Sequence, residues 1–232
     1  VVEQGVVRAR GVGLAKLRVE VAEQVVNVDL FVGTKKGDSR LSFVGNVLPV
    51  LGRAGCAAGD CHAKPKGQNG FSLSVFSFDP VADYREVVKD ERGRRVFPAF
   101  PAESLLLKKP TLGVLHYGGR RLESVSLFYQ IIHDWIAQGM LYRLPDEPAL
   151  KSITVFPREQ RYTKSAAQQL VVTARFTDRT VRDVTHLSAF SSSNKDIAEV
   201  NPDGLVRTGM LSGEGVVVVR YMGEVAQARI TV

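Results

Sequence analysis

The two ends of the sequence repeat each other at a constant spacing. Four aligned pairs show the offset: Gly13 with Gly213, Val19 with Val219, Val25 with Val225, and Val32 with Val232. The tetrapeptide Gly5-Val6-Val7-Arg8 also resembles Gly204-Leu205-Val206-Arg207. Segments related in this way form the same supersecondary unit. Both copies alternate apolar and polar residues, which is the period of a half-buried strand, so we expect β structure at both ends of the chain.

Further strand-like segments precede only the second copy. Residues 149–232 contain apolar runs separated by turn sequences, a spacing that is typical of a small β-sandwich. Residues 1–36 match its C-terminal half alone. We therefore expect a partial sandwich at the start and a chain cut from a longer protein. A half sandwich has unpaired edges, so these strands should pair with another chain or with upstream residues.

The middle of the chain, residues 40–144, has a different pattern. Ser42 is suited to cap a helix whose apolar face is formed by Phe43, Val47, Val50 and Leu51. A second amphipathic helix is predicted from Ser124 to Gln138, with Gly139 ending it. The segment between them is rich in Gly and Pro. The predicted fold class is multidomain α plus all-β, with a helical domain between a partial β segment and a β-sandwich.

The basic charge is spread along the chain. The formal net charge is +7, from 31 Lys and Arg against 24 Asp and Glu. The basic residues occur as separate pairs such as Lys108-Lys109, without the aromatic-interleaved stripe that is typical of nucleic-acid-binding proteins. We expect no nucleic-acid partner, and the positive field instead favours an acidic protein. No apolar run approaches the roughly 18 residues of a membrane-spanning helix.

Both cysteines lie in one motif, Gly55-Cys56-Ala57-Ala58-Gly59-Asp60-Cys61-His62. A disulfide across so short a loop would remove little entropy from the unfolded chain, so the pair indicates ligand chemistry. Two cysteines followed by a histidine are typical of c-type haem attachment, although the usual spacer is two residues and here it is four. A haem would also fill the interior of the helical domain. Two alternatives stay open: a zinc site with His116 or His133 as fourth ligand, and ordinary cysteines beside a surface histidine.

The motifs around the cysteines resemble the planctomycete-type cytochrome c domain. They are Val47-Leu48-Pro49-Val50-Leu51, Gly67 to Ser74, Phe78-Asp79-Pro80, Gly93 to Val96, Ser104 to Pro110, His116 to Arg121, and Trp135 to Gly139. Residues 149–232 resemble the bacterial immunoglobulin-like domain of group 2, through Ser192-Ser193-Asn194 and Gly204-Leu205-Val206. In longer proteins of this kind such modules precede large domains, which agrees with a truncated first repeat.

The resemblance implies one covalent haem c. Cys56 and Cys61 would form the thioether bonds, and His62 would be the proximal iron ligand. In related small cytochromes the loop before the last helix supplies the distal ligand, and here that loop contains His116. Met140, just after the last helix, is the alternative. We therefore expect a bis-histidine haem, whose reduction potential is lower than that of a His/Met pair.

The other residues expected around the haem are predicted from sequence patterns that are less specific than the cysteine motif. Four arginines are candidates for bidentate contacts with the propionates: Arg94, Arg95, Arg120 and Arg121. Four apolar side chains are candidates for the haem wall, although ordinary core packing explains each of them equally well: Phe71, Leu73, Phe76 and Trp135. No Ser/His/Asp or paired-carboxylate arrangement indicates a catalytic site. We therefore expect an electron-transfer module and not an enzyme.

The predicted function is single-electron transfer by a c-type cytochrome with an acidic redox partner protein. Thioether attachment takes place outside the bacterial cytoplasmic membrane, so the expected location is periplasmic or extracellular. Two other classes stay open. A haem enzyme or gas-binding sensor would need an open distal site, and a zinc-stapled interaction module would need zinc and no haem.

Overall fold

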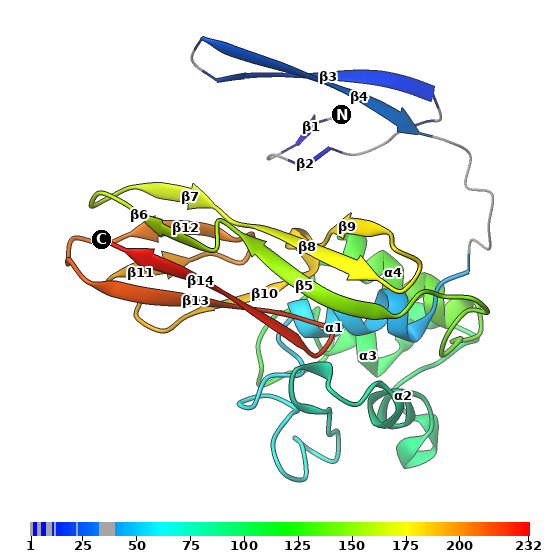
Figure 1. The fold of residues 1–232 in the computed structure, drawn as a ribbon. Coiled ribbons are helices and arrows are strands. Elements are labelled where there is room, and N and C mark those ends of the chain that lie inside the picture. Colours follow the sequence, from blue (N-terminus) through cyan, green and yellow to red (C-terminus); the bar gives the residue numbers. More distant parts are fainter. Residues whose placement is uncertain (1, 4–5, 8–10, 12, 22, 33–39) are drawn as a thin grey trace. The chain divides into compact units, whose positions relative to one another are not determined.

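A computed structural model gives the fold of the chain (Figure 1). It describes residues 2–3, 6–7, 11, 13–21, 23–32 and 40–232. The chain divides into two compact units, Val1–Ser39 and Arg40–Val232. The predicted matches of Gly5 and Arg8 to the second repeat lie outside the described residues.

The described strands of the first unit form two antiparallel pairs. β1 (Val2–Glu3) pairs with β2 (Val6–Val7), and β3 (Gly13–Val21) pairs with β4 (Gln24–Val32). The longer hairpin keeps one register along its whole length. Several of its apolar side chains are exposed: Leu14, Val19, Val25, Val26 and Val28. The N-terminal strands expected from the repeat are present, and none of their described side chains is fully buried.

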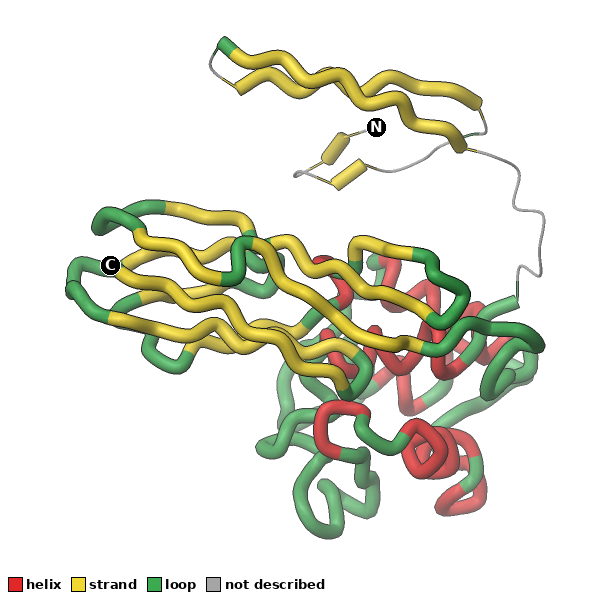
Figure 2. Tube along the Cα trace, in the orientation of Figure 1, coloured by secondary structure: helices red, strands yellow, loops and turns green. Residues whose placement is uncertain are grey.

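The α-helices of the described residues lie in residues 40–148, called the helical half below (Figure 2). They are α1 (Leu48–Arg53), α2 (Pro80–Val88), α3 (Leu105–Lys108) and α4 (Leu127–Ala137). A π turn at Phe43–Val47 leads into α1, and 3₁₀ turns lie at Val75–Ser77, Asp90–Gly93 and Pro101–Glu103. In the described part of the chain, no helix has both the length and the apolar character to cross a membrane.

Side-chain caps start the first and last helical segments. The Ser42 hydroxyl accepts a hydrogen bond from the Gly45 N–H at 2.8 Å, as the sequence predicts. The last helix begins later than predicted, because the hydroxyl of Ser126, and not that of Ser124, accepts from the Tyr129 N–H at 3.2 Å. Gly139 follows this helix with a φ of 91°, a left-handed conformation that glycine adopts without strain.

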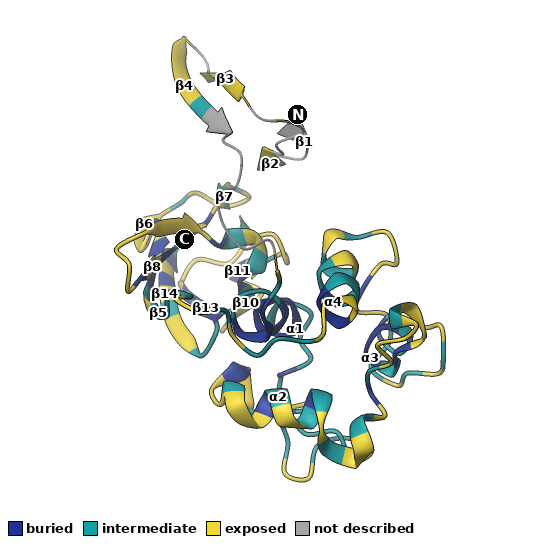
Figure 3. Ribbon diagram, turned by 90° about the vertical axis from the view of Figure 1, so that its right-hand side faces the viewer, coloured by how far each residue is buried: buried dark blue, intermediate teal, exposed yellow. Residues whose placement is uncertain are grey.

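The helical half has its own hydrophobic core (Figure 3). The predicted apolar face after Ser42 is buried, and so is Trp135 of α4. The Trp135 ring lies 5.7 Å from the Phe43 ring, and its Nε1 donates to the Leu141 carbonyl at 2.9 Å. Burying an aromatic side chain of this size stabilises a fold by about 2–3 kcal/mol. The helical segment after Ser42 and the helix α4 thus pack against each other, although they lie far apart in the sequence.

Residues 149–232 form the predicted β-sandwich. Its strands are β5 (Leu150–Phe156), β6 (Glu159–Arg161), β7 (Ala167–Gln169), β8 (Val171–Phe176), β9 (Val181–Asp183), β10 (Ala189–Ser192), β11 (Ala198–Val200), β12 (Leu205–Thr208), β13 (Glu214–Tyr221) and β14 (Glu224–Thr231). The strand orders are β10-β13-β14-β6, β5-β8-β9 and β11-β12-β7. Alternate residues of β13, such as Val217 and Val219, are fully buried against Val172 and Ala174 of β8 in one core.

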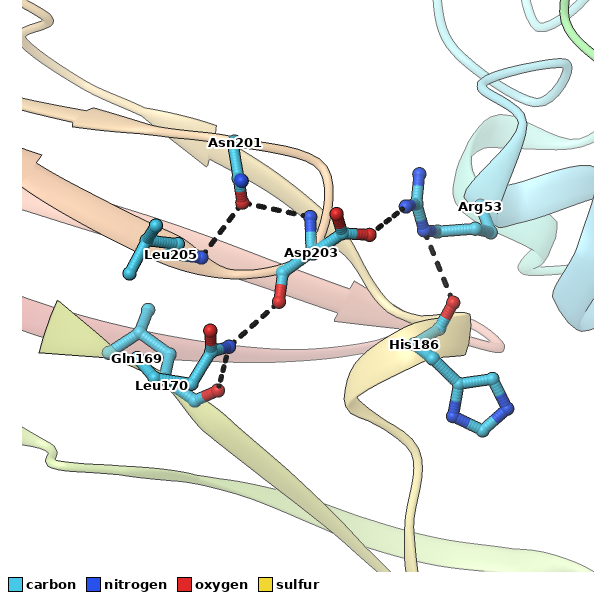
Figure 4. A network of polar contacts seen from close by, with 7 residues as sticks. All are labelled: Arg53, Gln169, Leu170, His186, Asn201, Asp203 and Leu205. Carbon is cyan, nitrogen blue, oxygen red and sulfur yellow. Dashed lines mark hydrogen bonds and ion pairs between the residues drawn. The ribbon is translucent and has the colours of Figure 1, made fainter. Parts of the chain in front are cut away.

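Arg53, at the end of α1, joins the helical half to the sandwich (Figure 4). Its Nε donates to the His186 carbonyl at 3.2 Å, and its Nη2 lies 3.2 Å from a carboxylate oxygen of Asp203. The Asn201 side chain accepts from the Asp203 N–H at 2.9 Å, and Gln169 donates to the Asp203 carbonyl at 2.8 Å. The arginine therefore binds a turn that the sandwich itself holds rigid.

Apolar and aromatic contacts extend this junction. Leu187 and Met222 pack against both hydrophobic cores. The guanidinium of Arg220, in β13, lies 4.2 Å from the centre of the Phe76 ring in the helical half. A cation over an aromatic face contributes about 0.5–2 kcal/mol, depending on its burial. The sandwich is thus packed against the helical half and is not merely tethered to it.

Candidate functional site

The cysteine loop, residues 55–62, follows α1 directly. The Cys56 N–H donates to the Leu51 carbonyl at 3.0 Å, and the Cys56 carbonyl accepts from the His62 N–H at 3.1 Å. Between them, the Cys61 N–H donates to the Ala58 carbonyl at 3.0 Å. These bonds fold the four-residue spacer back on itself, so His62 returns to the end of the loop where Cys56 lies.

The two cysteines have different surroundings, and both are free thiols. Cys56 packs against the core of the helical half, and burial raises the pKa of its thiol to about 12, with the neighbouring Cys61 adding to the effect. Its thiol is therefore protonated near neutral pH and is not a reactive thiolate. The Cys61 Sγ lies 3.8 Å from Nη2 of Arg121.

His62 and His116 face each other across the site. Their ring centres are 6.3 Å apart and their planes differ by 10°. Nδ1 of His62 lies 3.1 Å from the Phe71 carbonyl, and Nδ1 of His116 lies 2.8 Å from the Gly119 carbonyl. An imidazole that donates from Nδ1 keeps the lone pair of Nε2 available for a metal ion. Burial lowers the pKa of His62, which also favours the neutral, ligating form.

The separation of the two rings agrees with a metal ion held between two imidazoles. A ligating nitrogen lies about 2 Å from its metal, and the ring centre lies about 1 Å further away, so two such rings have centres roughly 6 Å apart. The separation of His62 and His116 matches that distance. The two Nδ1 bonds to backbone carbonyls are the outer contacts that orient ligating histidines. Two thiols next to His62, with a second imidazole 6.3 Å away, are groups that a covalent c-type haem would use.

Arg95 supports the His62 side of the site from within the protein. Its guanidinium is buried and donates to the Gly70 carbonyl, to the Glu86 carbonyl at 2.8 Å and to the Asp90 carbonyl at 3.1 Å. It also lies 4.8 Å from the centre of the Phe71 ring, which is 4.5 Å from the His62 ring. Arg95 therefore holds the segment whose carbonyl orients His62.

The other predicted propionate ligands lie nearer the surface. Arg94 is exposed, with Nη2 3.4 Å from the Asn69 carbonyl. Arg120 is exposed and pairs with Glu123 at 3.4 Å. Arg121 is exposed, and its Nε donates to the Gly118 carbonyl at 2.8 Å. Arg121 also lies 3.8 Å from the Cys61 Sγ, and all three arginines stay predictions as propionate ligands.

The predicted wall residues divide into two groups. Leu73 and Trp135 are buried in the core of the helical half, and Phe71 packs against that core while touching His62. Phe76 is 36% exposed and faces Arg220 of the sandwich. Of the four, Phe71 is therefore the one that contacts a predicted ligand, His62.

The remaining candidates for iron or zinc ligands make other contacts. Met140, the alternative distal ligand, packs against the helical core, and its carbonyl accepts from the Tyr84 hydroxyl at 2.7 Å. His133 is half-buried on α4, with Nδ1 2.9 Å from Asp134. Among the residues that the structure describes, no cluster of three or more His, Cys, Asp or Glu side chains has the arrangement of a metal site. The described residues therefore do not assemble the four-ligand zinc site.

No role was predicted from the sequence for Gly118, which packs against the ring of His116. A Cβ added at Gly118 would lie 2.9 Å from Cε1 of His116, closer than side-chain carbons normally approach. Glycine at this position lets the imidazole lie flat against the backbone of its own loop. The Gly118-Gly119 pair beside a histidine was the available signal.

Comparison with known proteins identifies one part of the chain. Residues 149–220 match the bacterial Ig-like domain (group 2) family. The predicted immunoglobulin-like domain is thereby confirmed over these residues, and it is a non-catalytic module. No curated protein matches the chain.

Proposed function

We propose that residues 40–148 carry one covalent c-type haem between His62 and His116 and act in single-electron transfer. The observation that carries this proposal is the pair of nearly parallel imidazoles, 6.3 Å apart, beside two free thiols. A bound haem would supply the one-electron couple of its iron. The chain would supply the thioether bonds at Cys56 and Cys61 and the two axial ligands.

The surrounding residues would keep both ligands oriented and water away from them. The carbonyls of Phe71 and Gly119 hold the two imidazoles through Nδ1. Arg95, which also pairs with Glu86 at 3.6 Å, fixes the segment behind His62. Arg94, Arg120 and Arg121 are the proposed propionate contacts.

The proposed location is outside the cytoplasm. Covalent haem attachment takes place there in bacteria, and the match of residues 149–220 to a bacterial Ig-like domain agrees with it. The non-catalytic character of that domain supports an electron-transfer module and not an enzyme.

Haem content is the first test. The full chain, produced together with the haem-attachment machinery, should give a pyridine haemochrome spectrum of one haem per chain that acid-acetone does not extract. A variant with both Cys56→Ala and Cys61→Ala should lose the covalent haem. Wild-type protein that is colourless under these conditions would overturn the proposal and favour an interaction module without haem.

The distal ligand is tested by a matched pair of histidine variants. His116→Ala should convert a six-coordinate low-spin spectrum to a high-spin one, whereas His133→Ala should leave the Soret and α bands unchanged. An unchanged spectrum in His116→Ala would overturn the distal assignment. Carbon monoxide binding to the reduced wild-type protein at neutral pH would instead favour an open site, as in a haem enzyme or gas sensor.

A further inference from the structure

A cleft of about 620 Å³ lies where the sandwich meets the helical half. One wall is formed by five residues of the cysteine loop, Gly55 and Ala57 to Asp60. The opposite wall includes the strand β10 and the end of β13. This is called the basic cleft below, and its volume is in the range of sites that hold a ligand of several functional groups.

Four arginines line the basic cleft, and they come from both of its walls. Arg53, Arg120 and Arg121 belong to the helical half and Arg220 to the sandwich. Among the described residues of the lining, Asp60 is the one acidic side chain. The lining therefore carries a formal charge of about +3 at neutral pH.

Two of these arginines have carboxylate partners and two do not. Arg53 pairs with Asp203 and Arg120 with Glu123. Within the described part of the chain, no carboxylate lies within ion-pair distance of Arg121 or Arg220. One unpaired guanidinium thus stands on each side of the cleft.

Both unpaired guanidinium groups are held in place. Arg121 donates to the Gly118 carbonyl and lies 3.8 Å from the Cys61 Sγ. Arg220 donates to the Ser191 hydroxyl at 2.8 Å and stacks on Phe76. The Phe76 N–H in turn donates to the Ala57 carbonyl of the cysteine loop at 2.9 Å. Positive groups fixed in this way lose little conformational entropy when an anion binds.

We infer that the basic cleft is the docking site for an acidic segment of a protein partner, with the sandwich supplying half of the site. The inference rests on the proposed function, in which a haem propionate would engage Arg121 while Arg220 of the sandwich wall would stay open to the partner. A segment with several carboxylates fits the observations better than a single small anion, because the four arginines of the lining come from both walls. The net charge of +7 would also attract an acidic protein at long range.

The test uses the haem-loaded full chain and a fluorescein-labelled octaglutamate peptide, followed by fluorescence anisotropy at low and moderate salt. Arg220→Gln should weaken binding by about three- to tenfold at low salt, with a smaller effect as salt screens the charges. Arg220→Lys, which keeps the charge, should restore most of the affinity. Arg207→Gln is the matched control, because Arg207 is exposed on β12 and does not line the cleft.

Two outcomes would overturn the inference. If Arg207→Gln weakens peptide binding as much as Arg220→Gln does, the peptide binds to the diffuse positive charge of the surface and not to this cleft. If sodium sulfate, at matched ionic strength, displaces the peptide far better than sodium chloride does, the cleft is a small-anion site. Haem content is measured separately on each variant, so protein without haem would refute the proposed function while the anisotropy still reports on the cleft.

Discussion

The two long hairpins of the chain, β3–β4 and β13–β14, have the same register and very different surroundings. Val19 lies opposite Val26 in the first, as Val219 lies opposite Ala226 in the second. Val19 is 42% exposed, whereas Val219 is 0% exposed. The alternation of apolar and polar residues is therefore enough to specify the hairpin, but it does not decide whether the apolar side chains are buried.

The difference lies in the neighbouring strands. In the sandwich, β10 pairs with β13 and β6 pairs with β14, and β5 and β8 contribute to the same core. Among the described residues, β3 and β4 form a sheet of two strands. A two-stranded hairpin alone is marginally stable in water, because it cannot cover its own apolar face. Within the described residues, the second hairpin of the repeat therefore has neighbouring strands on both sides and the first has none.

Hydrogen exchange should show the largest contrast. We expect the hydrogen-bonded amides of β13 and β14 to exchange roughly a thousandfold more slowly than those of β3 and β4, because only the former open with the whole sandwich. Residue-resolved exchange on the full chain measures both in one sample. Equal protection would mean that a partner or a second copy covers the first hairpin.

A matched pair of truncations tests the same contrast in stability. Val219→Ala removes fully buried methyl groups and should lower the free energy of unfolding by about 2–3 kcal/mol. Val19→Ala, at the corresponding position, should change it by less than about 0.5 kcal/mol. Urea denaturation of both variants gives the comparison, and a large effect from Val19→Ala would contradict it.

High pH should destabilise the sandwich through Tyr221, whose counterpart in the first hairpin is Val21. Burial raises the pKa of Tyr221 to about 12. The neutral phenol is favoured in the folded state, so its stabilising effect is complete below pH 10 and is lost as the pH rises from 10 to 12. We expect a loss of about 1.4 kcal/mol at pH 11.

The control for this titration is Tyr221→Phe. Unfolding curves at pH 8 and pH 11 should show a smaller decrease for Tyr221→Phe than for the wild type. The same decrease in both proteins would assign the effect to other groups.

The exposed ion pairs of the two hairpins should contribute least to the free energy of unfolding. Lys16 lies 3.7 Å from Asp29 in the first hairpin, and Arg229 lies 3.6 Å from Glu214 in the second. All four side chains are about half exposed or more, so solvent screens both pairs. Asp29→Asn and Glu214→Gln should each change the unfolding free energy by less than about 0.5 kcal/mol. A larger effect from one of them would show that the hairpins differ in charge as well as in burial.

Much of the local structure follows from periodicity. Sequence patterns predict the cap at Ser42, the buried face of the last helix around Trp135 and the strands of the sandwich. The pairing of His62 with His116 could be expected only through the resemblance to a known domain. The structure places the centres of these two rings 6.3 Å apart with nearly parallel planes, while the haem itself stays a proposal.

Contacts between segments that lie far apart in the sequence produce no periodic pattern of residues. Arg94 and Arg95 are adjacent and equally basic, yet Arg94 is exposed and Arg95 is buried among backbone carbonyls. The junction of Arg53 with Asp203 joins residues from separate halves, and nothing near either residue indicates the other. Such contacts depend on how whole elements pack, which local sequence patterns do not encode.

The wall that the sandwich contributes to the basic cleft sets an order of events during biogenesis. The cysteine loop, residues 55–62, precedes β14 in the chain, and the sandwich cannot close until β14 pairs with β13 and β6. In a chain that enters the extracytoplasmic compartment with its N-terminal end first, the cysteine loop would arrive before the sandwich wall of the cleft is complete. In the proposed cytochrome, haem attachment in that compartment would precede closure of the sandwich, which would then finish the surface that a partner meets.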